Sequence, residues 1–117
     1  MYTSDDITEK NAIIGGTSLG TRDFGMLSAM VHVEYESGGQ GFGGYVLFNP
    51  NFMKGSKNYA GLFIWRVLEI AGVEEWSQLK GKAIRVRGNN QKITAIGHII
   101  KDDWFNIERE FAILEGE

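Results

Sequence analysis

Apolar and polar residues alternate most regularly in the segment Leu27–Tyr35. Every second residue there is apolar or aromatic, a period of two that is typical of a strand with one buried face. We therefore predict a strand whose apolar face looks into the core. Shorter apolar runs predict further strands at Ile7–Ile14 and Tyr45–Phe48. The glycine-flanked segment Gly15–Gly25 is too long for a tight hairpin, and we predict a loop there.

Helical periodicity is strong in one segment, from Asn58 to Ala71. Asn58 is a suitable N-cap, and Gly72 stands where a left-handed C-terminal cap is expected. The predicted core stripe of this helix consists of Ala60, Phe63, Ile64, Val67 and Ala71.

The opposite face of the helix carries Leu62, Trp65, Arg66 and Glu69. A leucine and a tryptophan on an outward face are usually covered by another segment of the chain or by a partner. Either the segment Glu74–Leu79 or the carboxy-terminal tail covers them within the monomer, or the face is a subunit interface, where Trp and Arg are common.

Two strand-like segments, Lys82–Arg87 and Lys92–Ile100, flank a strong turn signal. A two-residue turn at Asn89–Asn90 suits type I′ geometry and predicts a hairpin. In that register Val86 lies opposite Ile93, which closes an apolar face.

The other face of the predicted hairpin is basic. Arg87 then lies opposite Lys92 and Arg85 opposite Thr94, with His98 farther along. Like charges that face one another are mildly destabilising, so we expect an acid, solvent or a bound anion to balance them. The face is either a solvated edge or a phosphate site, and a lone histidine there is more often structural than catalytic.

The tail changes from apolar to acidic and aromatic at Lys101–Asn106, before a short helical segment at Ile107–Leu114. Asp102 and Asp103 are expected to cap that helix or to pair with the basic hairpin face. With His98 they would form an incomplete set of metal ligands, so we predict no metal site.

These elements predict an α+β fold, with one twisted, mostly antiparallel sheet of about five strands packed on one main helix. We expect the 117 residues to form a single domain, 1–117. The chain has no cysteine and no apolar run near the roughly 18 residues that span a bilayer, so we expect a cytoplasmic protein without membrane contact. A net charge of −3 argues against a protein that grips duplex nucleic acid over its whole surface.

Much of the glycine lies in one cluster, Gly38–Gly44. A dinucleotide-binding loop would need a helix after the glycines, and a strand is predicted instead. The chain also has no Walker lysine and no Gly-x-Ser-x-Gly elbow. We therefore predict no catalytic residue and no cofactor, and a flexible hairpin connection near a sheet edge that carries Gln40 and Phe42.

Two segments carry a resemblance, Gln40-Gly41-Phe42-Gly43-Gly44-Tyr45 and Ile96 to Phe105. Through them the chain resembles a small family of proteins commonly encoded by bacteriophages and prophages. It departs from the family pattern at Phe48, where an aspartate is expected, and at Ile107, where a proline is expected.

The resemblance implies a small accessory protein in the cytoplasm of an infected bacterium. Two functions follow: an oligomer that counters host defence by sequestering a cyclic nucleotide, or an inhibitor that binds a host defence protein through the Leu62–Trp65 face and the acidic tail. A structural accessory role without a ligand is a further alternative. In the oligomer that sequesters a cyclic nucleotide, cations bind phosphate and aromatic rings stack on a base. The candidate ligand residues are Gln40, Phe42, Tyr45, Arg85, Arg87, Lys92, His98 and Trp104, and the candidate interface residues are Leu62, Trp65 and Arg66.

Overall fold

The structure is a computed structural model that describes residues 8–36, 38–52 and 57–116. Its strands are β1 (Thr8–Asp23), β2 (Met26–Tyr35), β3 (Gly38–Phe48), β4 (Ala83–Gly88), β5 (Ile93–Gly97) and β6 (Trp104–Asn106). Its α-helices are α1 (Tyr59–Ala71) and α2 (Ile107–Glu115), and 3₁₀ turns lie at Pro50–Phe52 and Trp76–Gln78. The α+β class is confirmed. The expected five strands and one main helix fall short of the described elements by one strand and one helix.

All six strands pair antiparallel in one sheet, in the order β3-β2-β1-β4-β5-β6. The sheet curls so that β3 approaches β5, and the Gln40 side-chain amide donates to the Asn89 carbonyl across that seam at 2.7 Å. A central β1, a helix between β3 and β4, and the approach of β3 to β5 resemble the connectivity of OB-type barrels, whereas the sheet observed here is open and continues into β6.

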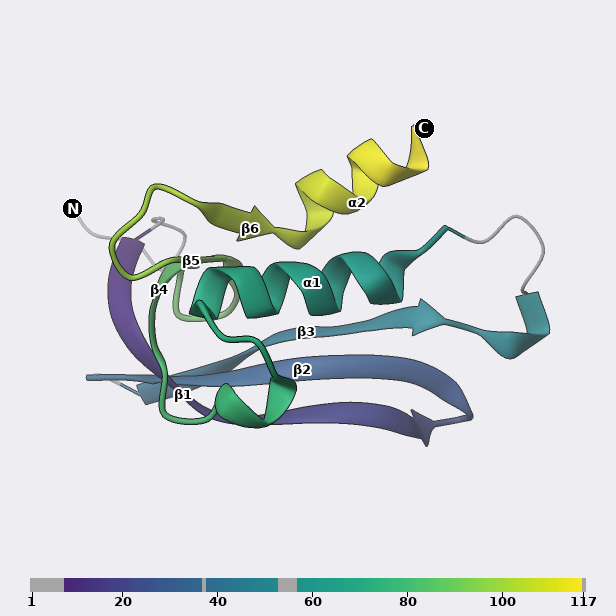
Figure 1. Cartoon of the computed structure of the whole chain (residues 1–117), viewed down its shortest axis with the longest axis horizontal. Helices are drawn as coiled ribbons and strands as arrows, with labels where there is room; N and C mark the ends of the chain where they lie inside the picture. The colour runs from purple at the N-terminus through teal and green to yellow at the C-terminus, as the bar shows by residue number, and fades with distance from the viewer. Residues whose placement is uncertain (1–7, 37, 53–56, 117) are drawn as a thin grey trace.

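The core lies between the inner face of the sheet and α1, and α2 runs beside α1 (Figure 1). Phe63, Val67 and Ile70 are the buried residues of α1. The rings of Phe42, Phe63 and Phe105 lie 5.6–6.3 Å apart and join β3, α1 and β6. This aromatic cluster fixes the helix against both ends of the curled sheet.

Helix α1 begins and ends as predicted. The Asn58 side chain accepts a hydrogen bond from the Gly61 N–H at 2.9 Å, and Gly72 has a left-handed φ of 70°. With 13 residues, α1 is the longest helix of the described ranges, and none of those helices has the length and apolar character of a membrane span.

The first strand is much longer than predicted. Ile7 lies outside the described residues, but β1 continues through the expected loop at 15–25 as far as Asp23. A register shift next to Gly15 marks a bulge, after which Thr17 pairs with Val31. The second half of β1 is extended because β2 supplies a partner, although its own sequence has no strand pattern.

The glycine cluster is strand β3 itself and not the connection that precedes it. It lies at an edge of the sheet, as expected. A side chain at Gly41 would meet the Met30 sulfur at 2.5 Å, while Gly43 and Gly44 have φ values of 113° and 81° at a register shift. The glycines therefore provide close packing and a bulge.

The predicted register of the second hairpin is wrong. Val86 pairs with Ile96 instead of Ile93, and β5 ends at Gly97 instead of Ile100. Asn89 accepts hydrogen bonds from the N–H groups of residues 91 and 92, which makes the connection four residues long. This side-chain turn replaces the expected two-residue type I′ turn.

Candidate functional site

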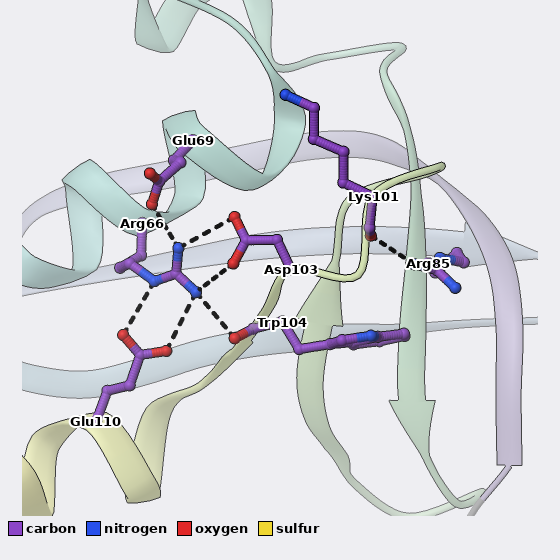
Figure 2. Close-up of polar contacts among 7 residues, drawn as sticks. All are labelled: Arg66, Glu69, Arg85, Lys101, Asp103, Trp104 and Glu110. Atoms are coloured by element: carbon purple, nitrogen blue, oxygen red, sulfur yellow. Dashed lines mark hydrogen bonds and ion pairs between the residues drawn. The ribbon is translucent and has the colours of Figure 1, made fainter.

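The densest polar cluster is centred on Arg66, which α1 presents to β6 and α2 (Figure 2). Its Nε donates to Glu110 at 2.9 Å, and Nη2 donates to Asp103 at 3.0 Å and to the Trp104 carbonyl at 2.8 Å. Nη1 forms an ion pair with Glu69. We call these residues the Arg66 node; it joins α1, the 98–103 loop, β6 and α2.

The node keeps a charge in a largely buried position, since the Arg66 side chain is 13% exposed. Burial lowers the pKa of Arg66, but hydrogen bonds to Asp103, Glu69 and Glu110 outweigh that effect and raise the pKa above its ordinary value. Three carboxylates surround one guanidinium, so the node is acidic overall.

The helix face that we predicted as an interface is only partly open. The tail covers Arg66 and leaves Leu62 half-buried, whereas Trp65 is 67% exposed. Arg66 is therefore a structural residue of the node, because its donors are already used within the chain. Asp103 pairs with this arginine and not with the basic hairpin face.

An open cleft of about 600 Å³ lies beside the node. Its lining residues are Arg66, Arg87, Asp102, Asp103, Trp104, Arg109, Glu110 and Ile113. Charges of both signs line it, and Ile113 of α2 is 60% exposed at its margin. Such an open, highly charged cleft differs from the mostly apolar, enclosed pockets that bind small molecules.

The two hairpin arginines pack on Trp104. Their Cζ atoms lie 4.8 Å (Arg85) and 3.7 Å (Arg87) from the centre of a Trp104 ring, and Glu9 of β1 accepts from both at 3.3 and 3.2 Å. Arg85 also donates to the carbonyls of His98 and Lys101. An acid therefore balances the basic face, and the cations that we predicted to bind phosphate contact the protein itself.

The other predicted ligand residues lie elsewhere. Phe42 is 1% exposed within the core, so neither face of its ring is open to a base. Gln40, Tyr45 and Lys92 lie at the β3–β5 seam, where Lys92 donates to Glu108 at 2.7 Å and Tyr45 to the same carboxylate at 3.4 Å.

The cavity at this seam has a volume of about 70 Å³. Pockets for small ligands measure roughly 300–1,000 Å³, so the cavity has room for a few waters and is too small for a nucleotide. The eight candidate residues thus separate into the core, the seam and the Trp104 cluster, and form no common site.

His98 has the structural role that we considered the more common one. Its Nδ1 accepts the backbone N–H groups of Ile100 and Lys101, each at 3.0 Å. Within the described ranges, no three His, Asp or Glu side chains gather where they could hold a metal ion.

Sequence reasoning missed Glu9 and Glu110 as the counter-charges of these arginines. Glu9 pairs with Arg87 through the β1–β4 register, and Glu110 reaches Arg66 from another helix. Neither contact can be predicted from a local sequence pattern. Comparison with protein-family models, curated proteins and solved structures found no significant match to this chain.

Proposed function

We propose that this chain is a binding protein that acts by contact with another protein, through the face of α1 and α2 around Trp65. In the setting that the sequence resemblance implies, its partner is a component of a bacterial defence system. The alternative, a sponge for a cyclic nucleotide, has less support because the predicted ligand residues do not converge.

The observation that carries the proposal is the exposure of Trp65 on helix α1. Trp65 is 67% exposed, directly beside Arg66, whose ion pairs hold α1 against β6 and α2. Ile113 adds a second exposed apolar side chain on the neighbouring helix. An exposed tryptophan on a pre-organised surface with a charged surround is typical of a protein-binding hot spot.

The test measures phage plating on bacterial strains that each carry one defence system. We expect the wild-type chain to restore plating in at least one strain and Trp65→Ala to reduce the effect by about tenfold or more. Val46→Ala is the control, since Val46 is an exposed apolar residue of β3 on the strand face opposite to the buried Leu47.

Two outcomes would contradict the proposal. Full activity of Trp65→Ala, or no effect of the wild-type chain in any strain, would remove the protein-binding role in defence. Binding of a cyclic nucleotide to the wild-type chain in native mass spectrometry would favour the sponge instead.

A further inference from the structure

The tip of the β1–β2 hairpin presents an unusual residue. Phe24 is 93% exposed and has a φ of 53°, a left-handed conformation that is uncommon for a bulky residue, and Gly25 follows with a φ of 79°. Arg22, next to the tip, is exposed and has no ion-pair partner within the described ranges. The hairpin ends at one extremity of the molecule (Figure 1).

A shallow groove lies in the first half of β1, on the sheet face of the exposed Ile13. Its volume is about 480 Å³, and Ile13, Ala83 and Ile99 supply apolar surface. Glu34 and Glu36 also line it, and in the part of the chain that the structure describes neither carboxylate has an ion-pair partner. The groove is thus apolar with an uncompensated negative rim.

The tip and the groove are complementary to each other. The tip offers an aromatic ring two residues from the unpaired cation Arg22, with the exposed Asp23 between them, and the groove offers an apolar hollow beside two unpaired anions. Ten residues of β1 separate Ile13 from Asp23, about 33 Å of extended strand, so a tip cannot reach the groove of its own chain.

We propose that a second copy of this chain occupies the groove. Phe24 of each copy packs against Ile13, Ala83 and Ile99 of the other, and Arg22 pairs with Glu34 or Glu36. Because tip and groove lie about ten residues apart along the same strand, a two-fold axis that crosses β1 between them would place each tip at the groove of the other copy. Between the tip and the groove, the β1 residues that pair with the exposed side of β2 are Gly16, Ser18 and Gly20. These small residues let the β1 strands of the two copies approach closely.

This dimer uses a different surface from the Trp65 face, so it does not rest on the proposed function. Sedimentation of the full chain tests it. We expect a wild-type dimer and at least about tenfold weaker association for Phe24→Ala, the loss expected of a hot-spot aromatic. Phe24 contributes nothing to the core, so circular dichroism should show an unchanged fold.

Trp65→Ala is the matched control, an exposed aromatic on the other surface, and we expect it to leave the dimer intact. A monomeric wild-type chain, or a dimer that Phe24→Ala leaves unchanged, overturns the proposal. A dimer that Trp65→Ala dissociates overturns it in favour of the helix face.

Cysteine pairing tests the contact directly, because the chain contains no cysteine. Asp23→Cys, which keeps the Phe24 ring, and Ala83→Cys variants, mixed under mild oxidation, should form a disulfide-linked pair. Asp23→Cys mixed with Ser77→Cys, an exposed position outside the groove, should form far less. Equal yields in both mixtures would overturn the proposed register.

Discussion

At the residue scale, the absence of a side chain at Gly97 lets the Trp104 ring pack against the backbone of β5. It pairs with both Arg85 and Trp104, and a Cβ at this position would lie 2.6 Å from carbon atoms of the Trp104 ring. Arg87 covers that ring at 3.7 Å from its centre. The indole therefore lies in a layer between glycine backbone and guanidinium, a position that no larger residue at 97 permits.

Gly97→Ala is expected to destabilise the chain by roughly 1–3 kcal/mol, the usual effect of overpacking a well-packed site. Gly20→Ala is the control, because a Cβ there meets nothing within 4 Å. Urea unfolding measures both; we expect a lower midpoint with an unchanged slope for Gly97→Ala alone. Equal midpoints would mean that Trp104 moves aside freely.

Removal of Arg66 leaves Asp103 and Glu110 close together without their common cation. We expect Arg66→Met to lower the free energy of unfolding by about 2–3 kcal/mol, below the range for fully buried pairs because the carboxylates are partly exposed. Arg66→Lys should recover only part of this loss, since an ammonium group cannot reproduce the guanidinium fork.

Arg109→Met is the control for this comparison. Arg109 lines the same cleft but is exposed, so its replacement should change stability by less than about 0.5 kcal/mol. Similar urea midpoints for Arg66→Met and Arg109→Met would contradict a structural role for the node.

At the element scale, the sequence predicts well what local contacts determine. The sequence predicts both ends of α1 to within one residue, because the Asn58 side chain caps its first turn and the left-handed Gly72 backbone caps its last. The long β1, the glycine-rich β3 and the β4–β5 register were not predicted, because each depends on a partner strand. Phe42 shows the same limit at the candidate site: its glycine neighbours suggest exposure, whereas pairing with the buried Val31 of β2 places its ring on the core face.

At the scale of the whole molecule, the barrel connectivity raises the question of nucleic acid. OB-type barrels bind oligonucleotides on the face of strands 2 and 3, with aromatic platforms and a basic groove. Here the exposed side of β2 carries Ser28, Met30, His32 and Glu34, beside Gly39 and Gly41 of β3. These residues give little stacking area and little positive charge, so the topology alone does not support such a ligand.

Polar contacts connect α2 to the β3–β5 seam: Glu108 of α2 forms an ion pair with Lys92, the residue before β5, and accepts a hydrogen bond from Tyr45 of β3. The hydrogen bond and charge of Lys92 lower the pKa of the Glu108 carboxyl below its ordinary value of 4.5. A lowered pKa in the folded state means that the pair stabilises the fold above the ordinary pKa, and this contribution is lost as the pH falls through the lowered one. The contribution is small, because both side chains are more than half exposed.

A titration of the Glu108 carboxyl by nuclear magnetic resonance tests whether the seam is closed in solution. We expect a pKa below 4.5 in the wild-type chain and a return toward that value in Lys92→Met. Lys80→Met is the control, since Lys80 is exposed on the loop before β4. An ordinary Glu108 pKa in the wild-type chain would mean that α2 does not hold the β3–β5 seam.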